Sequence, residues 1–261
     1  MKKAIFFDLD DTLLNDRKSI QTAFDVTCGE LADTFQVDAK EIEESVRTKA
    51  REVYSTFPFY SFTQQIGINP FEGLWGNFGD LHHFRFREMG ENISKYQSEA
   101  WKQGLEPFGI KEEAAIQAMD RFKEVRRSSP FVYEETFEVL NTLKDHGYRL
   151  LLLTNGAPSL QMEKLAMTPE LPPYFEHIII SGNIGFGKPN PILFDHALRI
   201  MDVSADEAIM VGDNLSTDIL GSNRVKMESI WIDHLDGKVV KEAKPTYRVE
   251  RLKDILNLLS I

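Results

Sequence analysis

The chain has 261 residues, of which 42% are hydrophobic and 27% charged, a composition typical of a globular protein long enough for a full core and a smaller second unit. Its 41 acidic and 30 basic residues give a formal net charge of −11, which argues against a nucleic acid or an anionic membrane surface as the main partner. No apolar stretch approaches the roughly 20 residues of a membrane-spanning helix, so no membrane-embedded segment is expected.

The chain begins with a basic tripeptide and a short apolar run. The run at 4–7 stops at Asp8, which makes it too short for the apolar region of a signal peptide. The single cysteine, Cys28, cannot form an internal disulfide and agrees with a reducing compartment. We therefore expect a cytoplasmic protein.

Residues 4–7 are expected to form the first strand, because a short apolar run bounded by turn residues is typical of a buried strand. An acidic segment follows directly, Asp8-Leu9-Asp10-Asp11-Thr12. Taken alone, this segment could be a solvated turn that caps a following helix. The polar segments that follow later apolar runs make a functional role more probable than a cap.

Residues 16–130 contain no convincing strand and instead show apolar residues at helical spacing, with Ser128-Ser129-Pro130 typical of a linker at the end. One stripe consists of Ile20, Phe24, Cys28, Leu31 and Phe35. We expect a helical insertion that leaves and re-enters beside the first strand, as a lid would, with Cys28 and most of its aromatic residues as core. Tyr60 and Arg85 are candidates for reading a substrate.

Four more strands are predicted in the second half, at 149–153, 177–181, 208–212 and 229–232. Helical patterns at 136–146 and 191–202 separate strands, and another closes the chain at 250–259. This alternation predicts βαβ units and an α/β fold with a parallel sheet. Right-handed crossovers then bring the carboxyl ends of the strands to one edge, where ligands bind in open α/β sheets.

Polar segments lie at or near the carboxyl ends of these strands. They are Thr154-Asn155-Gly156, Lys188 between Gly187 and Pro189, and Gly212-Asp213-Asn214 with Asp218 just beyond. Clustered carboxylates repel one another and repel an anionic ligand, whereas a hard divalent cation relieves both repulsions. Oxygen ligands with room for water and phosphate suit Mg²⁺ better than zinc, so we expect magnesium and a phosphate group at this edge.

The order Asp-x-Asp-x-Thr, Thr-Asn-Gly, Gly-Lys-Pro and Gly-Asp-Asn-x-x-x-Asp resembles the haloacid dehalogenase superfamily, and within it the small-molecule phosphatases. The resemblance covers essentially the whole chain. It implies a Rossmann-like parallel-sheet core, residues 1–15 and 131–261, with a helical cap, 16–130, inserted between the first and second motifs.

The resemblance also implies roles for the catalytic residues. Asp8 would be the nucleophile that attacks phosphorus and forms an aspartyl-phosphate, and Asp10 the general acid and base. Lys188 would supply the remaining positive charge beside the phosphate, and Thr12 would fix the turn.

Two further sets of residues are implied by the resemblance. The phosphate-binding set is Thr154, the N–H groups of Asn155 and Gly156, and Lys188. The set that holds Mg²⁺ is Asp8, the backbone carbonyl of Asp10, and Asp213, with Asp218 orienting water or Lys188.

We therefore expect a Mg²⁺-dependent phosphatase acting on a small phosphorylated metabolite, for which phosphoserine, a phosphosugar, phosphoglycolate and a nucleoside monophosphate are candidates. A 2-haloacid dehalogenase or a phosphomutase on the same core is an alternative, although Asp10 and Asp213 with Asp218 speak against the metal-free dehalogenase. A phospho-accepting signalling module or a non-catalytic phosphate-binding module is an alternative from another class. Neither a nucleic acid nor a membrane is expected as partner.

Overall fold

The computed structural model describes residues 2–235 and 239–261. It contains two compact units, a core unit of Met1–Asn15 with Val132–Ile261 and an inserted unit of Asp16–Phe131. The sequence placed the second boundary between residues 130 and 131, one position earlier. Phe131 belongs to the inserted unit, where the Lys18 Nζ lies 4.3 Å from the centre of its ring.

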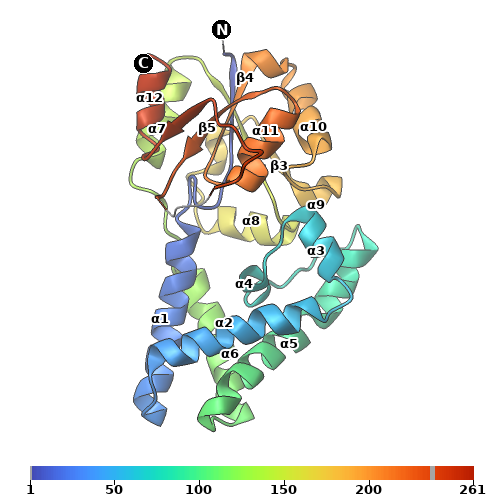
Figure 1. Ribbon diagram of the computed structural model, residues 1–261, viewed down its shortest axis with the longest axis vertical. Coiled ribbons are helices and arrows are strands. Elements are labelled where there is room, and N and C mark those ends of the chain that lie inside the picture. The colour runs from blue at the N-terminus through green and yellow to red at the C-terminus, as the bar shows by residue number, and fades with distance from the viewer. Residues whose placement is uncertain (1, 236–238) are drawn as a thin grey trace. The chain divides into compact units, whose positions relative to one another are not determined.

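Within its described residues, the core unit contains a six-stranded sheet in the order β3-β2-β1-β4-β5-β6 (Figure 1). All neighbouring strands are parallel. The strands are β1 Ala4–Phe7, β2 Arg149–Thr154, β3 His177–Ile180, β4 Ala208–Gly212, β5 Glu228–Ile232 and β6 Tyr247–Val249. The parallel α/β fold predicted from the sequence is confirmed. Strand β6 was not predicted, because it has only three residues and two of them, Tyr247 and Arg248, are exposed.

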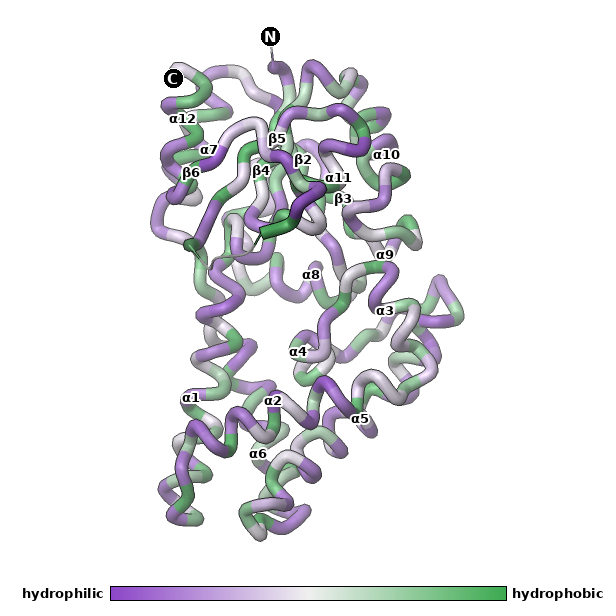
Figure 2. Tube along the Cα trace, in the orientation of Figure 1, coloured by the Kyte–Doolittle hydropathy of each residue, from purple (hydrophilic) through white to green (hydrophobic). Residues whose placement is uncertain are grey.

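Helices cover both faces of the sheet. They are α7 Thr136–Asp145, α8 Pro158–Ala166, α9 Ser181–Ile184, α10 Pro191–Met201, α11 Leu220–Arg224 and α12 Asp254–Leu258, with a π-helical turn at Leu215–Ile219. Alternate residues of β1 point to opposite faces. Phe7 belongs to the same hydrophobic cluster as Leu140 of α7 and Ile255 of α12, whereas Phe6 belongs to a second cluster that includes Phe194 of α10. The central strands are accordingly hydrophobic in Figure 2.

The inserted unit is helical over the residues that the structure describes. Its helices are α1 Asp16–Phe35, α2 Ala39–Ser55, α3 Tyr60–Ile66, α4 Pro70–Gly73, α5 Phe84–Leu105 and α6 Glu112–Ser128. Hydrophilic and hydrophobic residues alternate along the long helices, as expected for amphipathic helices (Figure 2). Aromatic side chains fill the core of this unit, where the rings of Phe24 and Phe122 lie 4.7 Å apart.

The inserted unit also contains a buried cysteine and a buried ion pair. Cys28 is buried, and burial raises the pKa of its thiol to about 12, which agrees with the expected role as core filler. The first and last helices are joined by a buried ion pair between Asp16 and Arg126, whose guanidinium also lies 4.4 Å from the ring of Trp75. In the part of the chain that the structure describes, no helix combines the length and the apolar character needed to cross a bilayer.

Candidate active site

The register of the parallel strands brings Asp8 to the centre of the carboxyl edge of the sheet. Phe7, the last residue of β1, pairs with Leu152 on β2 and with Val211 on β4. The N–H of Asp8 donates to the carbonyl of Val211 at 3.0 Å. Segments that follow β2 and β4 therefore flank Asp8 on its two sides.

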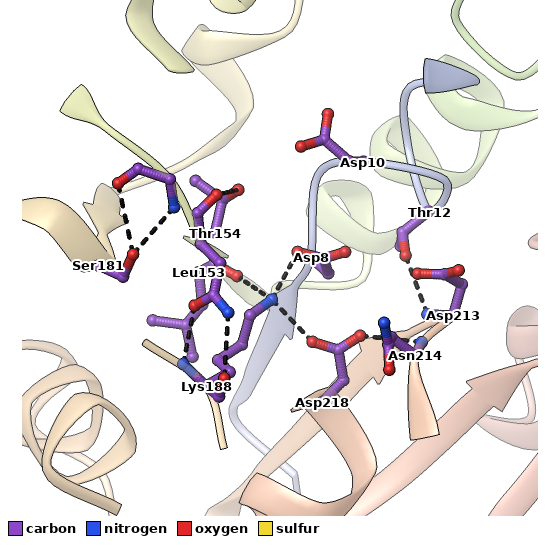
Figure 3. A network of polar contacts seen from close by, with 12 residues as sticks. Asp8, Asp10, Thr12, Leu153, Thr154, Ser181, Lys188, Asp213, Asn214 and Asp218 are labelled. Carbon is purple, nitrogen blue, oxygen red and sulfur yellow. Dashed lines mark hydrogen bonds and ion pairs between the residues drawn. The ribbon is translucent and has the colours of Figure 1, made fainter. Parts of the chain in front are cut away.

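Asp8 is a buried carboxylate with a cation beside it (Figure 3). The Nζ of Lys188 lies 2.5 Å from its Oδ1. Burial raises the pKa of Asp8 to about 7; the charge of Lys188 opposes this rise, and the neighbouring carboxylate of Asp218 adds to it. Near neutral pH both the protonated and the ionised form of Asp8 are thus populated, and a bound cation would favour the ionised form.

Lys188 links the two sides of the site. Its Nζ donates to Asp8, to the carbonyl of Leu153 at 2.7 Å, and pairs with Asp218 Oδ1 at 2.7 Å. Burial alone would lower the pKa of Lys188, but the charges of Asp218 and Asp8 outweigh it and raise the pKa above its ordinary value. The lysine is therefore a fixed positive charge.

The loop that carries Lys188 is held by the amide side chain of Asn155. Asn155 Oδ1 accepts from the N–H of Lys188 at 2.7 Å, and its Nδ2 donates to the Lys188 carbonyl at 3.1 Å. Asn155 was predicted to bind phosphate through its backbone. Its side chain has a second task, which joins the Thr154-Asn155-Gly156 segment to the lysine loop.

Asp8, Asp213 and Asp218 form a group in which one carboxylate oxygen from each residue lies within 4.8 Å of the other two. Asn214 donates its N–H to Asp218 Oδ2 at 3.1 Å. A Cβ on Gly212 would lie 2.3 Å from that same oxygen, so only glycine lets Asp218 approach the strand end. Three oxygen donors with a net negative charge fit a hard divalent cation such as Mg²⁺.

Two side chains orient Asp213. Thr12 Oγ1 accepts from the N–H of Asp213 at 3.1 Å, and the indole of Trp231 donates to its carbonyl at 2.9 Å. Thr12 thus ties the segment after β1 to the segment after β4, in addition to the turn-fixing role expected for it. Trp231 was not singled out from the sequence, because a strand tryptophan carries no signal of such a contact.

The segment after β2 departs from the sequence expectation at one residue. Thr154 is buried at the end of the strand, near Asp8 (Figure 3). The N–H of Gly156, however, donates to Ser181 Oγ at 2.9 Å. This donor was expected to bind a phosphoryl oxygen, and in this structure the hydroxyl of Ser181 accepts from it instead. Gly156 has φ 145°, a conformation that favours glycine.

The Asp10 carboxylate lies apart from the carboxylate group and points away from it in Figure 3. Its Oδ2 accepts from Lys164 Nζ at 2.8 Å, and Gln161 Nε2 lies 3.4 Å from the same oxygen. Both partners are on α8, which the sequence analysis did not assign. Their spacing of three residues, on a helix that begins directly after Thr154-Asn155-Gly156, is the signal that could have found them.

A parallel α/β core carries clustered carboxylates, a buried lysine and a threonine at its strand ends, an arrangement suited to a divalent cation and an anionic group. The haloacid dehalogenase-like hydrolase model matches residues 2–225, which is most of the chain. The chain belongs to the haloacid dehalogenase-like hydrolase family.

Two relatives and one solved structure illustrate the similarity. A phosphoserine phosphatase from Thermus thermophilus is 31% identical over 97% of this chain and 97% of its own length. A glyceraldehyde 3-phosphate phosphatase from Pyrococcus abyssi is 38% identical over 47% of this chain and 52% of its own length. The magnesium-bound structure of the HAD-hydrolase YfnB from Bacillus subtilis has a TM-score of 0.67 and 20% identity, and covers 100% of this chain and 99% of its own. The protein is a phosphatase of this family.

Proposed function

We propose that this phosphatase hydrolyses the phosphomonoester of a small metabolite with the help of Mg²⁺ and through an aspartyl-phosphate on Asp8. The observation that carries the proposal is the position of Asp8, a buried carboxylate 2.5 Å from the Lys188 ammonium and within 4.8 Å of two other carboxylates. A nucleophilic carboxylate needs its charge balanced before an anionic phosphate can approach. Lys188 supplies part of that balance, and Mg²⁺ would supply the rest.

The metal would be held by Asp8 and Asp213, with the backbone carbonyl of Asp10 as a further ligand and Asp218 beside them. When bound, it would neutralise charge on the transferring phosphoryl group. Lys188 and Thr154 would bind phosphoryl oxygens. The proposed role of Asp218 is to hold Lys188 in place, as its ion pair with that lysine supports.

The reaction would have two steps. An Asp8 oxygen attacks phosphorus, the bond between phosphorus and the ester oxygen breaks, and Asp10 gives its proton to the departing alkoxide. Water then attacks the aspartyl-phosphate, Asp10 takes a proton from that water, and the bond between phosphorus and Asp8 breaks. Inorganic phosphate leaves, and both carboxyl groups return to their first state.

We propose a small phosphorylated metabolite as the substrate, and phosphoserine as the first compound to test, since the relative with nearly full coverage bears that activity in its name. A phosphosugar, phosphoglycolate and a nucleoside monophosphate belong in the same screen.

We further propose that the inserted unit is a cap that selects the leaving group, because it lies in the chain between the segments of Asp8 and Thr154. With its single cysteine, Cys28, the enzyme is proposed to act in the cytoplasm.

The nearest rival activity is carbon–halogen cleavage by the same nucleophile. The pair of Asp10 with the buried Lys164 argues against it, since a carboxyl group held at that place serves an ester leaving group. Asp213 would also be without purpose in a metal-free reaction. A phosphomutase is a second rival, and it would need a bisphosphate primer.

The test is phosphate release from a set of phosphorylated metabolites by the wild type and two variants. We expect release with Mg²⁺ and none after EDTA, and Asp8→Asn should lower turnover by more than about 10³ because it removes the nucleophile. The matched control is Asp195→Asn, the same change at an exposed position of α10, which should keep full turnover. Release that survives EDTA or Asp8→Asn would overturn the mechanism.

A further inference from the structure

A lysine is buried beside the proposed general acid. Lys164, on α8, is 1% exposed, and its Nζ lies 2.8 Å from Asp10 Oδ2. Burying an ammonium group is costly unless a carboxylate offsets its lost hydration. Asp10, the carboxyl group that the mechanism needs most, provides that carboxylate.

The same helix also contacts the segment after β2. Gln161 is buried one turn before Lys164, and its Nε2 donates to the carbonyl of Asn155 at 2.8 Å. The side chain packs against Gly156, where a Cβ would lie 2.4 Å from Gln161 Nε2. Helix α8 thus joins the Asp10 carboxylate to the segment proposed to bind the phosphoryl group.

We propose that Lys164 is a positioning residue for Asp10, supported by Gln161, and that the pair sets the place from which Asp10 exchanges a proton with the leaving group. The proposal rests on the phosphatase mechanism above. Oδ2 of Asp10 accepts from Lys164 and lies 3.4 Å from Gln161 Nε2, so two side chains of α8 hold one oxygen of this carboxyl group in place. Lys164 therefore acts through Asp10 and does not touch the substrate.

This role predicts an effect that depends on the leaving group. An alkoxide needs a proton as its bond to phosphorus breaks, whereas a nitrophenolate is stable enough to depart without one. A misplaced Asp10 should slow the hydrolysis of an alkyl phosphate and spare that of 4-nitrophenyl phosphate. A lysine that bound substrate directly would raise KM for both compounds.

The experiment compares kcat and KM of the full-length enzyme for an alkyl phosphate, such as phosphoserine or glycerol phosphate, and for 4-nitrophenyl phosphate. For Lys164→Met we expect kcat on the alkyl ester to fall between about 10- and 100-fold, with kcat on the nitrophenyl ester and both KM values changed less than about threefold. Gln161→Met should show the same pattern at smaller amplitude. In an Asp10→Asn background, Lys164→Met should add no further loss.

The control is Lys253→Met, the same change at a half-exposed lysine of the core unit that pairs with Glu138. It should leave all four constants unchanged. Circular dichroism and the thermal midpoint show whether each variant folds, and if Lys164→Met does not, Gln161→Met carries the test. Three results would overturn the proposal. They are an equal loss of kcat on both esters, a rise in KM without a loss of kcat, and an additive loss of kcat in the Asp10→Asn background.

These outcomes are separate from a failure of the proposed function. That failure would appear in the wild type, as absent phosphate release, or in Asp8→Asn, as retained release. A wild type that needs Asp8 and Asp10 while Lys164→Met behaves like wild type on both esters would refute only the role of Lys164.

Discussion

At the scale of single residues, the protonation of Asp8 should govern metal binding. Burial raises the pKa of this carboxyl group to about 7 from an ordinary value of 3.8, and only the ionised form offers a charged ligand. The ionised fraction falls from about nine-tenths at pH 8 to about one-tenth at pH 6. Mg²⁺ should therefore bind about tenfold more weakly at pH 6 than at pH 8 and release about one proton per ion at pH 6.

Isothermal titration calorimetry in two buffers with different ionisation enthalpies measures both the affinity and the proton release. The comparison protein is Asp8→Asn, which has no titrating group at this position and should bind Mg²⁺ weakly at either pH. An affinity of the wild type that is the same at pH 6 and pH 8 would contradict the assignment of Asp8 as a ligand that must lose a proton.

At the scale of elements, the turn between β2 and α8 depends on the absence of a side chain at Gly156. An alanine there would have φ 145° and a Cβ 2.4 Å from Gln161 Nε2, so both the backbone and the α8 contact would be strained. We expect Gly156→Ala to lower the free energy of unfolding by about 1–3 kcal/mol and kcat by at least about tenfold. Urea denaturation and phosphate release measure the two effects.

Gly147 provides the matched control for this substitution. It also has a positive φ, 81°, but a Cβ there would meet nothing within 4 Å. Gly147→Ala should cost about 1–2 kcal/mol through the backbone alone and leave kcat unchanged. If both variants lost activity equally, the loss would reflect stability and not the contact between Gly156 and Gln161.

At the scale of the whole molecule, catalysis and substrate choice are proposed to belong to different units. If the inserted unit selects the leaving group, Tyr60→Phe and Arg85→Met should change the ranking of phosphorylated metabolites by about tenfold or more while 4-nitrophenyl phosphate turnover stays within about threefold. Arg85 is paired with Glu88 at 2.8 Å, so its removal changes the surface charge of α5. The measurement is kcat/KM over the substrate panel.

Arg121→Met is the matching control, since Arg121 is also a half-exposed arginine of the inserted unit in ion pairs, here with Glu30 and Glu124. It should leave the ranking as it is. An unchanged ranking in Tyr60→Phe and Arg85→Met would assign these residues a structural role, and other residues of the inserted unit would have to be tested.

The sequence by itself determined the parallel α/β core and the proximity of Asp8, Lys188, Asp213 and Asp218. It could do so because apolar runs that end in turn residues locate strands, and because parallel strands have their carboxyl ends at one edge. The helical character of residues 16–130 was likewise visible in the spacing of apolar residues. These signals are local or periodic in the sequence, and they do not depend on tertiary contacts.

Only the tertiary structure decided which partner each polar group takes. The N–H of Gly156 donates to Ser181, 25 positions away, and Asp10 pairs with Lys164, 154 positions away. No sequence spacing encodes such contacts, because they depend on how α8 and α9 pack on the sheet and on which rotamers that packing allows. The arrangement of the strand ends thus follows from the pattern of apolar runs and turn residues along the sequence. The hydrogen-bond partners that orient the side chains are set by the packing of the fold.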